Sequence, residues 1–159
     1  MGMRGSYNTF DGDFVQKDLA NPKGLLEKID FNGPSIEIDQ AWQAIHFLLC
    51  GVSFDGEPPL GYVVPLRGEN ALDLKGIACD VDMFALTSQQ VQEAYHSIKD
   101  MGEQELRAKY HPESFAEKKI YGWIDDEKEF EYIYERFRFI QDFYQEASQN
   151  NRGMIFQVK

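Results

Sequence analysis

The chain has 159 residues, of which 43% are hydrophobic and 14% aromatic, and its 27 acidic and 16 basic residues give a formal net charge of −11. The length suits one domain with a sizeable core, and the aromatic content argues against a disordered chain. The negative charge argues against binding to nucleic acid or to an anionic membrane surface, because both carry phosphate that the protein would repel. A basic partner would be attracted instead, although net negative charge also serves solubility alone.

The cysteines and the hydropathy of the sequence indicate the cellular compartment in which the protein acts. Cys50 and Cys79 form neither a CxxC pair nor a metal-ligand spacing, and both lie among apolar residues. We therefore expect buried, reduced thiols and no disulfide framework. No apolar run approaches the length of a membrane span, and the N-terminus lacks the layout of a signal peptide. Together these features predict a cytoplasmic protein.

The N-terminal region predicts a strand followed by helices. Residues 3–10 alternate like a strand, which we prefer to the short myristoylation pattern that residues 1–6 also match. A helix over residues 11–20 follows and ends at Asn21-Pro22. Pro22 then suits the first turn of a second helix.

The clearest helix signal covers residues 38–50. Ile38, Ala41, Trp42, Ile45 and Leu49 share one face at a spacing of 3.6 residues, and only two glutamines are clearly polar. This helix should be buried on most sides and should end at Gly51.

Residues 52–77 form the least regular part of the sequence. Two adjacent prolines and several glycines exclude a long regular element, and only a short strand near residues 62–66 is expected. The segment is too long for a simple connection, so it is interpreted as a functional lid or a packed loop.

The C-terminal half predicts several helices between two strands. Thr87 and Gln90 form a capping box at the start of a helix that Gly102 should close. The remaining predicted elements are a strand at 81–86, short helices at 103–110 and 112–118, a long aromatic helix from Asp125 or Asp126 to about residue 149, and a strand at 154–158.

This order predicts an α+β fold and not a doubly wound one, because strands and helices do not alternate regularly. We expect a small mixed or antiparallel sheet covered by several helices, in a single compact domain that spans residues 1–159. The strands at the two ends of the chain are expected to lie near each other.

Known catalytic and cofactor motifs are absent from the sequence. It has no HExxH, GxSxG, GxGxxG or P-loop pattern, so we predict no metal, no cofactor and no identifiable catalytic residue. His46 is the one histidine of interest, because it lies at the margin of the buried helix face, one turn beyond Trp42. It is interpreted either as a histidine at the edge of the core bonded to a backbone carbonyl, which we favour, or as a ligand-binding group. Cys50, one turn further on, is a weaker candidate nucleophile.

The pattern Asp39-x-x-Trp42-x-x-x-His46-Phe47-Leu48-Leu49-x-Gly51 resembles the YfbM-like family of uncharacterised bacterial proteins. Pro59-Leu60, Leu66-x-Gly68-Glu69, Leu86-Thr87, Leu106 and Ile120-Tyr121 extend the resemblance over nearly the whole chain. The resemblance implies a compact bacterial fold with helices and strands, and it transfers no activity, cofactor or catalytic residue. The family typically has a smaller residue where Cys50 stands, which argues against a catalytic thiol.

Two functional hypotheses remain open. The first, which we favour, is a non-catalytic binding or regulatory protein whose acidic charge neutralises a basic protein partner. The second is an enzyme or small-molecule binder that uses a groove between the helix at 38–50 and the segment at 52–77. Its candidate ligand-binding residues are Trp42, His46, Glu69 and Tyr121.

Overall fold

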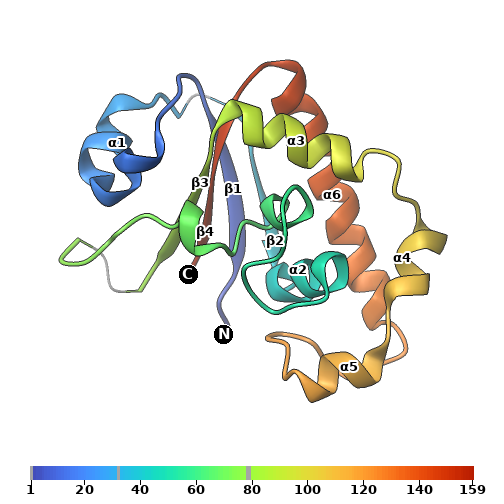
Figure 1. Cartoon of the computed structure of the whole chain (residues 1–159). Helices are drawn as coiled ribbons and strands as arrows, with labels where there is room; N and C mark the ends of the chain where they lie inside the picture. The colour runs from blue at the N-terminus through green and yellow to red at the C-terminus, as the bar shows by residue number, and fades with distance from the viewer. Residues whose placement is uncertain (1, 32, 78–79) are drawn as a thin grey trace.

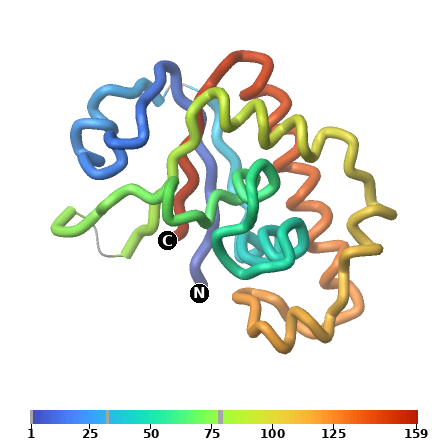
Figure 2. The backbone as a smooth tube through the Cα atoms, viewed as in Figure 1, coloured from blue at the N-terminus to red at the C-terminus, as the bar shows by residue number. Residues whose placement is uncertain are grey.

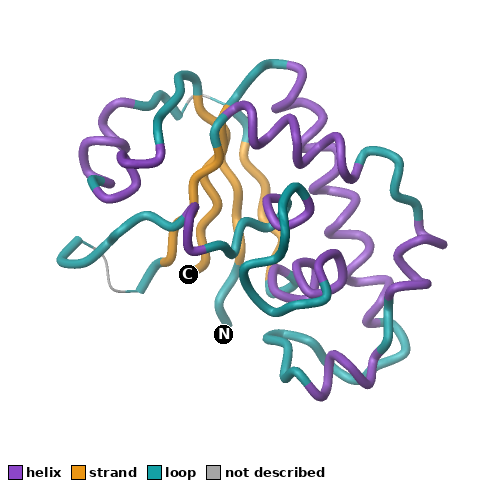
Figure 3. Tube along the Cα trace, viewed as in Figure 1, coloured by secondary structure: helices purple, strands orange, loops and turns teal. Residues whose placement is uncertain are grey.

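One antiparallel sheet organises the protein, with strands in the order β2-β1-β4-β3. The structure is a computed structural model that describes residues 2–31, 33–77 and 80–159. The strands are β1 (Gly5–Phe10), β2 (Ser35–Asp39), β3 (Asp82–Leu86) and β4 (Gly153–Val158). The first and last strands pair at the centre of the sheet, which is orange in Figure 3. The expectation that the terminal strands lie near each other is therefore confirmed.

The register of the strands separates two faces. Tyr7 lies opposite Phe156, and Phe156 lies opposite Phe84, so these side chains share one face of the sheet. The next register position places Asn8, Ile155 and Ala85 on the other face, because successive side chains alternate.

Helices cover the two faces unequally. The helices are α1 (Pro22–Lys28), α2 (Trp42–Cys50), α3 (Ser88–Ile98), α4 (Glu103–Lys109), α5 (Pro112–Glu117) and α6 (Glu129–Gln149), with short 3-10 turns η1 (Gln16–Ala20), η2 (Leu60–Tyr62) and η3 (Gly68–Asn70). Figure 1 places α1 on one side of the sheet and α2 to α6 on the other, and the tube in Figure 2 shows the same division. The α+β class is confirmed.

The core follows this division. The larger cluster joins Tyr7 and Phe156 of the sheet to the apolar faces of α2, α3 and α6. The smaller cluster packs Phe10 and Ile155 against η1 and α1. The sheet thus has a large hydrophobic core on one side and a minor one on the other, as expected when most of the apolar helix surface lies on one face.

Most elements lie where the sequence predicted them. The capping box of α3 is present, with the Gln90 N–H donating to Oγ1 of Thr87 at 3.1 Å. Gly51 ends α2 with a left-handed φ of 75°, as the sequence predicted. The strands at both ends and the helices α1, α4 and α5 are also found. Gly102, however, lies at the N-cap of α4, because α3 ends at Ile98.

Three predicted boundaries were wrong for local reasons. The helix expected from Ile38 begins only at Trp42, because residues 35–39 form strand β2 and Asp39 takes a φ of 55°. The helix expected from residue 11 is reduced to η1, because Gly12 has a φ of 97° that no right-handed helix accepts. The long helix α6 starts at Glu129, since Oδ1 of Asp126 accepts the Lys128 N–H in a turn.

The short strand expected near residues 62–66 was also wrong. This segment begins at Tyr62, the last residue of η2, and continues without a strand partner. The side chains of Tyr7, His46 and Tyr144 donate to the backbone carbonyls at positions 63 and 64 instead. Side-chain donors therefore hold a backbone that a neighbouring strand would otherwise satisfy.

Candidate functional site

His46 lies inside the fold, with no exposed surface. It projects from α2 towards the central loop, which we define as residues 51–70. Nδ1 of the ring lies 2.7 Å from the carbonyl oxygen of Val64, and the Gly56 N–H donates to Nε2 at 3.1 Å. Both ring nitrogens are thus engaged by the backbone of the same loop.

These two partners define the tautomer of His46. A carbonyl oxygen can only accept, so Nδ1 carries the proton, and an N–H can only donate, so Nε2 is unprotonated. Burial is the largest influence and lowers the pKa of His46 below its ordinary value, while the bond to Val64 and the charge of Asp55 act in the opposite direction. The neutral ring is therefore the form that the fold requires.

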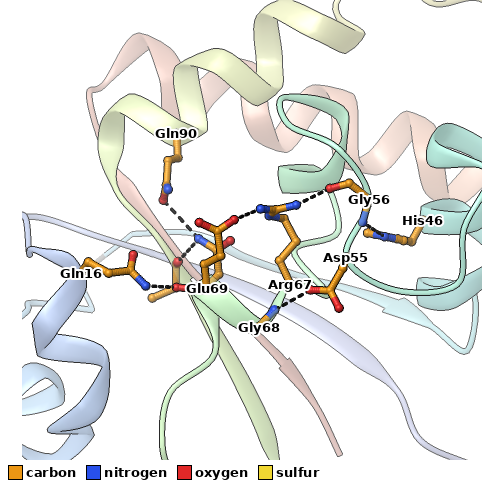
Figure 4. Close-up of polar contacts among 10 residues, drawn as sticks. Gln16, His46, Asp55, Gly56, Arg67, Gly68, Glu69 and Gln90 are labelled. Carbon is orange, nitrogen blue, oxygen red and sulfur yellow. Dashed lines mark hydrogen bonds and ion pairs between the residues drawn. The ribbon is translucent and has the colours of Figure 1, made fainter.

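Arg67 holds the loop from its other end. The guanidinium donates to the carbonyl oxygen of Gly56 and pairs with the carboxylate of Glu69 (Figure 4). It also lies 5.8 Å from the centroid of the Tyr62 ring. Arg67 is itself buried, so its charge is compensated by Glu69 and by the carbonyl rather than by water. A chain of contacts from Glu69 through Arg67 and Gly56 to His46 results.

The loop is also cross-bonded along its own length. Oδ1 of Asp55 accepts the Gly68 N–H at 2.8 Å, and the Asp55 N–H donates to the Leu66 carbonyl at 2.8 Å. The side-chain amide of Asn70 then donates to the Ala85 carbonyl of β3 at 3.0 Å. These bonds tie the end of the loop to the sheet and make it a fixed part of the fold.

Two buried tyrosines support the loop from beneath. Tyr7 of β1 and Tyr144 of α6 both donate to the carbonyl oxygen of Val63. Burial raises the pKa of both hydroxyls well above the ordinary value, so each remains a proton donor at neutral pH. The sheet and the long helix thereby fix the same point of the loop.

Trp42 and Tyr121 form a second cluster. Their rings stack with centroids 5.3 Å apart. The indole N–H of Trp42 donates to the Met3 carbonyl at 3.0 Å, and the Met3 N–H donates to the Tyr121 hydroxyl at 2.7 Å. The pair therefore clasps the segment that leads into β1, which is a structural use of both aromatic side chains.

A family model for a domain of unknown function, DUF1877, matches residues 1–157 of this chain. The chain belongs to the DUF1877 family. A crystal structure of a protein of unknown function, YfbM from Escherichia coli, shares the fold with a TM-score of 0.66 and 18% identity, covering 98% of this chain and 99% of that one. No match is found among curated proteins. The resemblance to YfbM-like proteins inferred from the sequence is confirmed, and at this identity the likeness shows the fold alone.

The surface of this DUF1877 domain is hollowed on the outer side of the central loop. A groove of about 620 Å³ lies between the loop and α3. Its lining comprises Pro58, Pro59 and Tyr62 from the loop and Gln92, Glu93, His96 and Ser97 from α3. His46, Arg67 and the two tyrosines thus fix, from the inside, the loop whose outer surface forms one wall of the groove.

The four predicted ligand-binding residues fall into two separate groups. Trp42 stacks on Tyr121, whereas Glu69 is linked to His46 through Arg67 and Gly56. His46 has no surface to offer to a ligand, and the favoured interpretation as a histidine bonded to a backbone carbonyl agrees with its geometry. Ligand binding by Trp42, Glu69 or Tyr121 stays a prediction.

Cys50 borders another hollow of about 510 Å³, together with Lys109, His111 and Ser114. Burial raises the pKa of its thiol to about 11, and the charge of Lys109 lowers it only in part. His46, one turn earlier on α2, accepts the Gly56 N–H at Nε2 and so does not serve as a base for this thiol. Cys79 lies outside the described residues.

Sequence reasoning missed the residues that fix the loop, above all Arg67 and Gly56. A charged residue directly after the run Val63-Val64-Pro65-Leu66 was the one available signal, because a long cation beside a buried run needs a partner. No sequence pattern indicates that Gly56 and His46 meet. Among the described residues there is no cluster of three or more histidine, cysteine, aspartate or glutamate side chains that could hold a metal.

Proposed function

We propose that this protein is a non-catalytic binding or regulatory protein whose partner is a basic protein. The observation that carries the proposal is the arrangement of His46: both of its ring nitrogens are bound to the backbone of the central loop. The residue best suited to acid–base chemistry is therefore used to hold the loop.

The second reactive side chain supports the same reading. The Cys50 thiol has a pKa of about 11 because of burial, so it carries almost no thiolate at neutral pH. None of the helices in the described ranges has the length and hydropathy needed to cross a membrane. The two cysteines form no CxxC pair and no disulfide framework, which fits a protein that acts in the cytoplasm.

The charge indicates the kind of partner. A net charge of −11 on 159 residues attracts a basic protein over long range and repels acidic ones. Exposed carboxylates such as Glu93 and Glu131 bring this charge to the surface. Association with a basic partner should be fast and sensitive to salt.

Small-molecule binding is the second candidate function, and the groove beside α3 favours it. A volume of about 620 Å³ lies within the range of about 300–1,000 Å³ that is usual for ligand sites. In this version the ligand contacts Tyr62 and α3 rather than Trp42 and His46.

Affinity purification of the tagged chain from its native host, at low and high salt, tests the proposal. We expect one basic protein at a fixed stoichiometry, released at high salt, that rebinds when both proteins are purified. Repeated purifications without a stoichiometric partner, combined with a thermal shift from a small metabolite, would favour the second candidate.

A further inference from the structure

We propose that the groove between α3 and the central loop holds a lysine or arginine side chain of the basic partner. The inference rests on the proposed function and adds the docking surface to it. The cation meets Glu93, and the apolar stem of the side chain lies along Pro58, Pro59 and Tyr62.

Glu93 supplies the charge. With His96 neutral, Glu93 is the one charged side chain among the lining residues. It makes no ion pair within the described residues. Its neighbour Gln92 is already bonded to the side chain of Asn151 at 2.6 Å. An exposed carboxylate without a cation is thus available in the wall of a mainly apolar groove.

The opposite wall suits the stem of a long cationic side chain. Lysine and arginine bury their methylene groups along apolar surface while the charged end stays near a carboxylate. Pro58 and Pro59 are exposed, and proline has little conformational entropy to lose when a partner docks. Tyr62 adds an aromatic ring beside them.

The loop wall is fixed before any partner arrives. The backbone on either side of Pro58 and Tyr62 is held by Arg67 at Gly56, and by Tyr144 at the carbonyls of Tyr62 and Val63. A preformed surface binds with a smaller entropic cost than a mobile one. In this arrangement, the buried contacts of Arg67 and Tyr144 with the loop backbone serve to hold the binding surface in place.

Charge complementarity decides between occupants. An anionic ligand or a nucleic acid would meet Glu93 and a net charge of −11. A second copy of the chain would carry the same charge and be repelled over long range. A cationic segment of another protein is the occupant that the groove attracts.

A titration of the ¹⁵N-labelled full chain with a capped hexapeptide tests the inference. The peptide carries one arginine between apolar residues, and its matched control carries citrulline, which keeps the shape and removes the charge. We expect amide shifts confined to Ser88–Ile98 and to residues 56–63, and weaker binding of the citrulline peptide.

Three variants sharpen the test. Glu93→Lys should weaken binding of the arginine peptide by about fivefold or more, because it removes one attraction and adds one repulsion. His96→Trp should block the groove sterically. Glu131→Lys makes the same charge change on α6, which does not line the groove, and should leave the affinity within about twofold.

The groove assignment is overturned if the peptide shifts amides over the whole acidic surface, if it shifts none, or if Glu93→Lys and Glu131→Lys weaken binding equally. The failure of the proposed function is a different result. If a basic partner is recovered from the host and binds the Glu93→Lys and His96→Trp variants normally, the function stands and only the groove assignment falls.

Discussion

The backbone N–H of Gly56 in the central loop donates to Nε2 of His46, in the middle of α2, across 3.1 Å. Because the same ring also meets the Val64 carbonyl at 2.7 Å, one side chain fixes two points of the loop that lie eight residues apart. His46, the residue for which the sequence most suggested a chemical role, therefore holds the central loop in place.

Replacement of His46 by alanine should strongly destabilise the fold. The change leaves the Gly56 N–H and the Val64 carbonyl buried without a partner, and it opens a cavity. We expect a loss of about 3–5 kcal/mol in the free energy of unfolding, measured by urea denaturation. His96→Ala, on the exposed face of α3, is the matched control and should cost less than about 0.5 kcal/mol. A His46→Ala variant as stable as this control would contradict the structural role.

Stability should also depend on pH through His46. Burial lowers the pKa of the ring in the folded state, so between pH 7 and 5 the unfolded chain binds more protons at this position than the folded one. The contribution of the neutral His46 ring to the free energy of unfolding is fully present well above the unfolded-state pKa of about 6.5. It is lost as the pH falls below that value. Melting temperatures of wild type and His46→Gln at several pH values isolate this effect as a difference in slope. If the melting temperatures of the two proteins changed in parallel with pH, His46 would have the same pKa in the folded and unfolded states, which contradicts the prediction.

Gly61 should not tolerate a side chain. A Cβ atom at this position would overlap the carbonyl oxygen of Gly56, so Gly61→Ala should destabilise the protein by about 1–3 kcal/mol. Gly68→Ala is the matched control in the same loop, because its Cβ would meet only Oδ1 of Asp55 at 3.8 Å. Thermal denaturation of the two variants checks the difference. Equal melting temperatures would mean that the loop backbone at Gly61 relaxes freely.

The thiol of Cys50 should react slowly in the native protein. With a pKa of about 11, its thiolate fraction at neutral pH is about 300-fold smaller than that of a free cysteine with a pKa near 8.5. In a Cys79→Ser background, alkylation by iodoacetamide should be slower by about this factor than in urea. A native rate comparable to that of glutathione would instead indicate an activated thiol and reopen the enzymatic hypothesis.

Much of the fold could be predicted because its signals are local. The capping box at Thr87, the αL position of Gly51 and the alternation of both terminal strands each depend on a few adjacent residues. The predicted start of the helix at Ile38 was wrong because Ile38 fits two patterns at once. With Ile36 it forms the alternation of strand β2, and it also fits the helical spacing of the apolar residues in α2. Two overlapping periods cannot be separated from one sequence.

The candidate site could be predicted only in part. Trp42 and His46 were identified from one helix, but the partners that define their roles come from elsewhere: Met3 and Tyr121 for the tryptophan, and Gly56 and Val64 for the histidine. Contacts between residues so distant in sequence leave no periodic signal. The groove beside α3 was missed for the same reason, since Pro58 and Glu93 meet only through the tertiary fold.

Long-range ¹H–¹⁵N correlation spectroscopy of the His46 ring tests most directly the claim that this residue is a neutral structural anchor. The account predicts the Nδ1–H tautomer, with Nε2 unprotonated, unchanged from pH 8 to below the ordinary histidine pKa of about 6.5 and unaffected by peptides that bind in the groove. A ring that carries its proton on Nε2, or that titrates like a solvent-exposed histidine, would contradict it.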